Sequence, residues 1–169
     1  MERNLNAILV LIISAILLGG FGVQIFMKET PCPLCWLQRI GMIGVAAGAF
    51  LNLQFGVRPA HYGLSLLSAL MGGTVALRQI SLHVCPGFSK FGIPVLGVSL
   101  YTWSFFVFAS ATLYIAGLLF LYDPKQPQHP SLTNNWLCRL AIWALLVVAF
   151  GNIVATLLQC GIGPCEDVH

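Results

Sequence analysis

The sequence predicts an all-α membrane protein with five transmembrane helices. Of its 169 residues, 58% are hydrophobic and only 8% are charged, whereas a soluble domain carries roughly 25% charged residues. The apolar residues form five long blocks instead of the short stripes of amphipathic helices. We therefore expect residues 1–169 to form a single integral membrane domain. The expected helices cover about residues 5–27, 36–55, 60–82, 97–122 and 136–158.

The first apolar block, residues 5–27, contains no charged residue. As a helix it would be roughly 35 Å long at about 1.5 Å per residue, enough to cross the hydrocarbon core of a bilayer. A secretory signal peptide has a shorter apolar stretch that closes at a small-residue cleavage site. We therefore expect this block to remain as the first transmembrane helix.

Small residues are concentrated in three of the blocks, in LLGGFG at 17–22, GVAAGAF at 44–50 and LMGGTV at 70–75. Such residues let helix backbones approach closely within a membrane. We expect them to serve the packing of the bundle.

Basic residues between the blocks or close to their ends predict the orientation of the chain, because Lys and Arg are favoured on the cytoplasmic side. In a five-helix arrangement, four of these residues lie on one side and two on the other. The larger group is Arg3, Arg58, Lys125 and Arg139, and the smaller group is Lys28 and Lys90. The N-terminus is therefore expected in the cytoplasm.

Five of the six cysteines fall on the side opposite to the N-terminus. They are Cys32, Cys35, Cys85, Cys160 and Cys165. Disulfides persist in oxidising compartments outside the cytoplasm, so this placement predicts a redox role for the five. Cys138 lies near the inner end of the last helix and is expected to be a buried thiol.

The segment PCPLCWLQR, residues 31–39, opens the second apolar block. Proline suits the first turn of a helix, where its missing N–H would have no helical partner, so the second helix is expected to start at this motif. Cys35 then lies in the first turn. The partial positive charge of a helix N-terminus favours a thiolate over a thiol, and Cys35 is therefore the predicted nucleophile.

Arg39 follows Cys35 by four residues and so lies on the same helical face. A guanidinium inside a membrane segment is costly and usually faces the bundle or a polar ligand, although an Arg can also extend to the interface. Trp36 supplies an aromatic surface beside it. Arg39 and Trp36 are therefore candidate ligand-binding residues.

Arg78 and His83 lie near the outer end of the third block. Arg78 is an intramembrane charge and hence a functional candidate, with an interhelical hydrogen bond as the alternative. His83 could donate a hydrogen bond to a ligand or transfer a proton, or it could simply be an interfacial histidine.

Two classes of ligand are not expected. A Cys-x-x-Cys pair can be half of a zinc site, but the other ligands of a zinc ribbon or finger are missing at suitable spacing. The basic residues are scattered and form no patch for nucleic acid. Membrane lipid is the expected surrounding.

The stretch PCPLCWLQR, between its two apolar blocks, closely resembles the DsbB family of membrane disulfide-forming oxidoreductases. RQISLHVCPGF and GIPVLGVSLYTWSFFVF resemble the second outer loop and the start of the fourth helix of that family, so the resemblance covers about residues 5–120. It implies a four-helix transmembrane bundle, to which this chain adds a C-terminal transmembrane helix.

The resemblance also implies a function. Cys32 and Cys35 would form the redox pair, and Arg39 would contact a membrane quinone, either ubiquinone or menaquinone. Electrons would come from a periplasmic DsbA-like protein with a thioredoxin fold. The protein would then lie in a bacterial inner membrane with its active site on the periplasmic side.

The chain departs from the family in its remaining cysteines. The second outer loop has only Cys85, and Val95 stands where related sequences have a second cysteine. The additional helix returns Cys160 and Cys165 to the same side. Cys85 could pair with one of these two, or they could pair with each other, and sequence alone leaves both possibilities open.

Three other functions fit parts of the sequence. A quinone reductase of the vitamin-K epoxide reductase type also couples Cys-x-x-Cys to a quinone, but its redox pair lies late in the chain. A carrier of soft metal ions would use thiolates, but the helices lack a ladder of Met or Cys. In a structural subunit the cysteines would only form cross-links.

Overall fold

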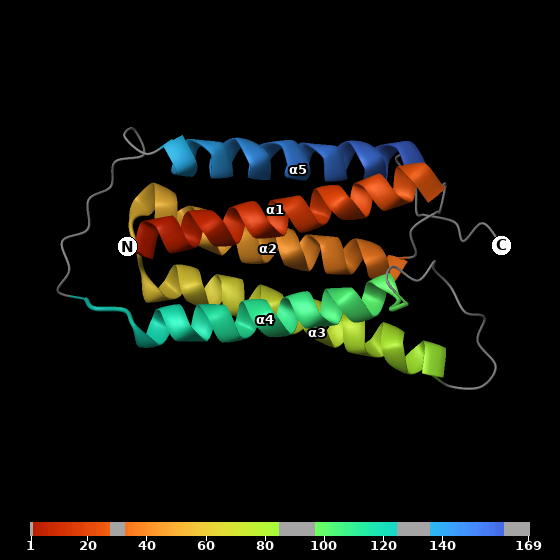
Figure 1. The fold of residues 1–169 in the computed structure, drawn as a ribbon, viewed down its shortest axis with the longest axis horizontal. Helices are drawn as coiled ribbons and strands as arrows, with labels where there is room; N and C mark the ends of the chain where they lie inside the picture. Colours follow the sequence, from red (N-terminus) through yellow and green to blue (C-terminus); the bar gives the residue numbers. More distant parts are fainter. Residues whose placement is uncertain (1, 28–32, 85–96, 125–135, 161–169) are drawn as a thin grey trace.

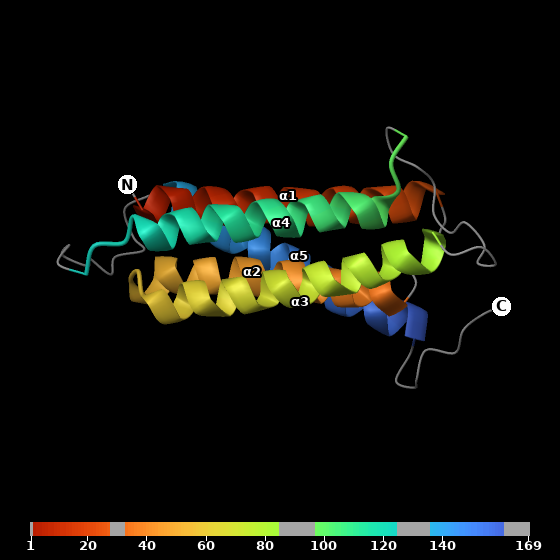
Figure 2. The ribbon, with the colours of Figure 1, turned by 90° about the horizontal axis from the view of Figure 1, so that it is seen from below.

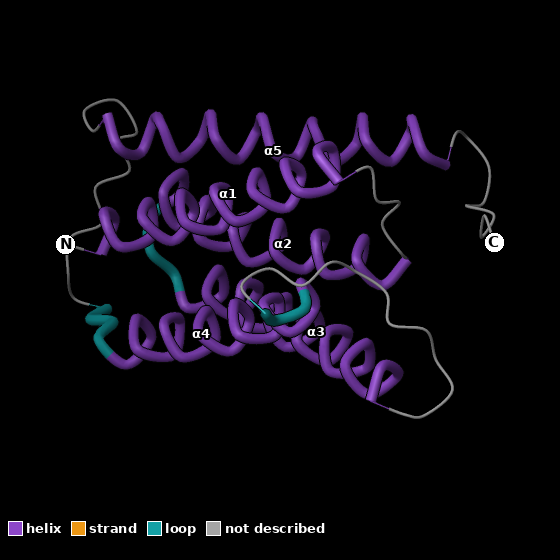
Figure 3. The backbone as a smooth tube through the Cα atoms, turned by 45° about the vertical axis from the view of Figure 1, so that its right-hand side comes forward, coloured by secondary structure: helices purple, strands orange, loops and turns teal. Residues whose placement is uncertain are grey.

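The computed structural model describes residues 2–27, 33–84, 97–124 and 136–160, and nearly all of these are helical (Figures 1 and 3). Each of the five helices is long and apolar enough to cross a membrane. This confirms the all-α membrane class. The helices are α1 (Glu2–Met27), α2 (Pro33–Phe55), α3 (Pro59–Val84), α4 (Leu100–Phe120) and α5 (Trp136–Cys160).

Helices α1 to α4 run up and down in a bundle, and α5 lies outside it against α1 (Figure 1). Viewed from below, α1 and α4 form one layer of the bundle, and α2 and α3 form the other (Figure 2). The most extensive helix contact is between α2 and α3. We call the end of the bundle where α2 begins the Cys35 end, and the end where α2 stops the Asn52 end.

The helix boundaries have local causes. Gly56 follows α2 with φ of 86°, a left-handed conformation that glycine adopts without the clash of a Cβ. Pro59 then occupies the first position of α3. Helix α4 starts at Leu100 and not at the expected residue 97, because Gly97 has φ of 78° and Ser99 is extended.

Helices α2 and α3 meet through a small-residue seam. At Gly44 an added Cβ would lie 2.9 Å from the Cβ of Ser68, and at Gly48 it would lie 2.9 Å from the backbone nitrogen of Ser65. Ser65 also donates a hydrogen bond to the Val45 carbonyl at 2.9 Å. The two backbones are therefore too close for larger residues. The seam consists of Gly41, Gly44 and Gly48 on α2 and Ser65, Ser68 and Gly72 on α3.

Not every small residue of the sequence serves this purpose. An added Cβ at Gly19, Gly20 or Gly22 of α1 would meet nothing within 4 Å. The small residues at 44–50 and 70–75 thus support close helix packing, whereas the glycines at 17–22 do not.

Helix α4 docks onto the seam through Phe108, which is 1% exposed. Its ring fills the space above Gly72, where an added Cβ would overlap the ring, and it also lies 3.2 Å from the position of a Cβ at Gly41. Because Gly41 and Gly72 leave this space, the single side chain of Phe108 packs α4 against both α2 and α3.

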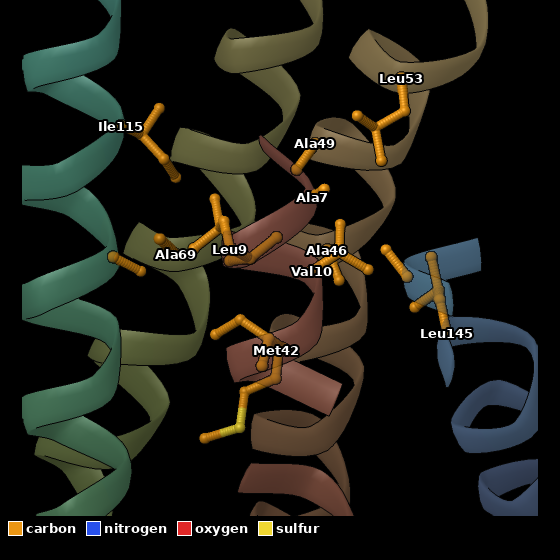
Figure 4. Close-up of a cluster of buried hydrophobic side chains, with 14 of the residues drawn as sticks. Ala7, Leu9, Val10, Met42, Ala46, Ala49, Leu53, Ala69, Ile115 and Leu145 are labelled. Carbon is orange, nitrogen blue, oxygen red and sulfur yellow. The ribbon is translucent and has the colours of Figure 1, made fainter. Parts of the chain in front are cut away.

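The remaining core consists of aliphatic side chains from all five helices. Figure 4 shows Leu9 and Val10 of α1, Met42 of α2, Ile115 of α4 and Leu145 of α5 in this cluster. Large apolar side chains also cover the outside, since Phe120 is 92% exposed and Leu113 is 75% exposed. Such an exterior suits a lipid environment.

Buried polar side chains fasten the Asn52 end. Asn6 of α1 donates to the Tyr62 hydroxyl of α3 at 2.9 Å and accepts from Asn52 of α2 at 3.2 Å. The Asn52 side-chain oxygen accepts the Arg58 backbone N–H at 3.0 Å and lies 3.0 Å from Nδ1 of His61. Three helices are thus joined by a network whose groups satisfy one another, as burial requires.

The seam predicts that Gly72→Ala destabilises the protein, because its methyl group would overlap the Phe108 ring. Overpacking of a tight site costs about 1–3 kcal/mol. We expect a lower unfolding temperature in detergent or nanodiscs. Gly63→Ala on the same helix is the matched control, since nothing lies within 4 Å of its Cβ position. Equal unfolding temperatures for the two variants would contradict the proposed packing.

Candidate redox site

Cys35 lies in the first turn of α2, which begins at Pro33. Its side chain is half-buried. The proline starts the helix and leaves the N-terminal N–H groups of α2 near the cysteine, which favours a thiolate. Cys32, the predicted other member of the pair, lies outside the described residues.

Arg39 lies one turn further into the bundle. Its guanidinium carbon is 4.6 Å from the ring centre of Phe21 on α1 and 5.4 Å from that of Trp36 on α2. An arginine over an aromatic face gains a cation–π attraction that increases when water is excluded. The side chain therefore lies against α1 as well as α2. The sequence pointed to Trp36 but gave no reason to single out Phe21.

A pair of buried glutamines, one of which contacts Cys35, was missed by sequence reasoning. Gln79 of α3, 4% exposed, places its Nε2 3.6 Å from the Cys35 sulfur. Gln38 of α2, 3% exposed, donates to the Gln79 side-chain oxygen at 2.6 Å. The sequence offered one signal for these glutamines, a polar amide inside an apolar helix. Such amides usually form hydrogen bonds with a neighbouring helix.

His83, one turn after Gln79 on α3, contacts the backbone of Gln79. Its Nδ1 lies 2.7 Å from the backbone carbonyl oxygen of Gln79, and its ring stacks on Tyr101 of α4 with 4.7 Å between centroids. A carbonyl oxygen only accepts hydrogen bonds. Nδ1 of His83 therefore donates to this carbonyl oxygen, and only in the neutral tautomer is Nε2 left as an acceptor.

The other predicted site residues are not brought into this group by the described structure. Arg78 is exposed, although its neighbour Gln79 is buried. Cys85 and Cys165 lie outside the described residues, and Cys160 ends α5 without a described side chain. Their pairing stays a prediction.

Two further observations concern the thiols. Cys138 is 0% exposed and forms no disulfide, which confirms the expected buried thiol. Among the described residues, no three His, Cys, Asp or Glu side chains are placed to hold a metal ion.

The fold and this site together define a class: a multi-pass helical membrane protein with a half-buried cysteine in the first turn of α2, at one end of its bundle. The family whose sequence profile matches the chain is described as disulfide bond formation protein DsbB, and the match covers residues 2–91. That range is more than half of the chain. The protein therefore belongs to the DsbB family, and the matched region contains α1, α2, α3 and the whole Cys-x-x-Cys motif.

Individual relatives are similar over a comparable region. Disulfide bond formation protein B 2 of Burkholderia lata is 40% identical over 72 residues, which are 42% of this chain and 43% of that protein. Disulfide bond formation protein B of Burkholderia pseudomallei is 36% identical over 92 residues, 52% of this chain and 54% of that protein. The protein of the same name from Marinobacter nauticus is 37% identical over 89 residues, 50% of this chain and 53% of that protein.

The chain thus spans about half the length of the curated relatives that it matches. No solved structure is a significant match. The likeness expected for residues 92–120 lies beyond the matched region, so it stays a prediction.

The amide pair predicts a particular pattern of stabilities. Gln38→Leu removes the N–H that the buried Gln79 oxygen accepts, so it should lower the free energy of unfolding. Gln38→Leu with Gln79→Leu should recover part of the loss, because replacing both partners leaves fewer unmatched polar groups. Unfolding of both single variants and the double variant should give a coupling energy of about 1 kcal/mol. If the losses in free energy of unfolding of the two single variants simply added up in the double variant, the proposed hydrogen bond between the amides would be contradicted.

Proposed function

We propose that the protein is a membrane thiol–disulfide oxidoreductase that reoxidises a periplasmic DsbA-like thioredoxin-fold protein and passes the electrons to a membrane quinone. The observation that carries the proposal is the placement of Cys35 in the first turn of α2, with the Arg39 guanidinium one turn deeper. Membership of the DsbB family supports it. The result would be disulfide formation in exported proteins.

The exchange steps require two kinds of thiol pair. Each exchange step begins when a thiolate attacks one sulfur of a disulfide. The attack forms a mixed disulfide and expels the second sulfur as a thiolate. Net, the partner's dithiol becomes a disulfide and releases two electrons and two protons. The outer cysteines Cys85, Cys160 and Cys165 suit the exchange with a protein partner, whereas Cys32 and Cys35 suit the membrane side.

The residues around Cys35 fit a quinone. When bound, a quinone supplies an acceptor for two electrons and two protons. Arg39 would donate hydrogen bonds to a carbonyl oxygen as negative charge develops, and it stays protonated when partly desolvated. The Phe21 and Trp36 rings that flank it offer apolar surfaces. His83 uses Nδ1 for the Gln79 carbonyl, so Nε2 is the atom at which it could pass on a proton.

The proposed site requires the Cys35 end to face the periplasm of a bacterial inner membrane. The distribution of Lys and Arg near the ends of the apolar blocks supports a cytoplasmic N-terminus. The start of α1 and the start of α2 lie at opposite ends of the bundle (Figure 1). A cytoplasmic N-terminus therefore leaves Cys35 on the other side of the membrane, where disulfides persist.

The first functional test is anaerobic quinone reduction by the purified protein in lipid, started by a reduced thioredoxin-fold dithiol. Cys35→Ala should abolish turnover because it removes the attacking sulfur. Cys138→Ala, which removes a buried thiol elsewhere in the bundle, should retain it. Equal turnover by the two variants would exclude Cys35 from the relay and overturn the proposal.

Arg39→Ala should lower the kcat/KM for quinone by about tenfold or more, which corresponds to about 1.4 kcal/mol of lost stabilisation. Arg39→Lys should recover only part, because an ammonium lacks the planar fork of donors. The exposed Arg139 on α5 provides the control variant Arg139→Ala. An unchanged KM and kcat for quinone in Arg39→Ala would remove Arg39 from the quinone site.

A further inference from the structure

The sulfur of Cys35 is contacted by a neutral side chain from another helix. The Nε2 of Gln79 lies 3.6 Å from Sγ, and Gln79 is 4% exposed. A hydrogen bond from an amide N–H stabilises an anionic acceptor more than a neutral one. The contact therefore favours the thiolate of Cys35 over its thiol.

The direction of the Gln79 amide is set by a second glutamine. Gln38 donates its N–H to the Gln79 side-chain oxygen at 2.6 Å. Rotating the Gln79 amide by half a turn would bring its NH₂ group against the NH₂ group of Gln38 and its oxygen against the sulfur. Two donors facing each other lose the hydrogen bond. With the Gln38 amide oriented as in the structure, the NH₂ group of Gln79 is therefore directed at Cys35.

The position of Gln79 along α3 follows from the small-residue seam. Gly48 meets Ser65, and seven residues along each helix Gly41 meets Gly72. Gln79 lies a further seven residues along α3, which is two turns, at the level of Cys35. The close approach of the backbones lets the glutamine side chain reach the sulfur. His83 secures the same turn through the Gln79 carbonyl and Tyr101.

We infer that Gln79 is a positioning residue that holds the Cys35 sulfur and stabilises its thiolate, with Gln38 orienting the Gln79 amide. The inference rests on the proposed function, in which the Cys35 thiolate is the nucleophile. In the reduced protein the Cys35 S–H proton leaves to solvent, and the sulfur lone pair accepts the Gln79 N–H. No covalent bond of Gln79 changes.

The test is alkylation of the reduced, full-length protein in nanodiscs as a function of pH. The Cys35 thiolate displaces iodide from iodoacetamide and forms a carbon–sulfur bond, and mass spectrometry of the peptides reads the rate at each cysteine separately. The pH at half-maximal rate reports ionisation, whereas the plateau rate at high pH reports access. The buried Cys138 should stay unreactive in every folded variant.

Gln79→Leu and Gln79→Met should both move the Cys35 midpoint to higher pH. Below the midpoint the rate should fall about tenfold, as expected for losing one hydrogen bond to a charged group. The plateau should stay within about twofold. Gln38→Leu should give a smaller shift in the same direction. Ser65→Ala, which removes another α2–α3 hydrogen bond far from Cys35, should give none.

A midpoint that stays unchanged in both Gln79 variants, with Cys138 still protected, would overturn the inference. So would a lower plateau without a shift, because it would mean that Gln79 only controls access. The experiment uses neither quinone nor a protein partner. Failure of the proposed function would therefore show as quinone turnover that Cys35→Ala retains, while failure of this inference would show only in the alkylation midpoints.

Discussion

The close approach of α2 and α3 determines the rest of the structure. In a membrane, apolar surfaces gain little by leaving lipid, so helices associate through packing and interhelical hydrogen bonds. Glycine and serine make both possible here, since Gly48 admits the Ser65 backbone and Ser65 bonds to the Val45 carbonyl. The same seam leaves the space that Phe108 of α4 fills. The packing of α2, α3 and α4 thus depends on a line of glycine and serine residues, which have no side chain or a very small one.

The seam also explains how the neutral amides of Gln38 and Gln79 come to lie beside Cys35 near a membrane boundary. Cys35, Gln38 and Gln79 need a fixed register between two helices, because a side-chain amide reaches only a few ångströms. This register is set by the close backbone contacts of α2 and α3 deeper in the bundle. Because the helices are rigid, it is the same at the level of Cys35. The polar network around Asn52 fastens the other end, so the site is supported from a distance.

Much of this architecture could be predicted from the sequence. The apolar blocks located five helices, and PCPLCWLQR located Cys35, Trp36 and Arg39 on one helix because helical spacing is local. The contacts of Gln79 could not be predicted in the same way. Which residue of α3 lies opposite Cys35 depends on the register of two helices, and small residues indicate close packing without naming their partners. Phe21 was missed for the same reason, since its role depends on how α1 lies against α2.

The short connection between α2 and α3 has a consequence for biogenesis. Gly56 and the next two residues join the two helices, so their contacts involve neighbouring segments of the chain and need little loop-closure entropy. The pair can assemble as a helical hairpin once α3 has entered the bilayer, while α4 and α5 are still being synthesised. Cys35 and Gln79 would then meet early, and α5, packed outside the bundle, would join a core that already exists.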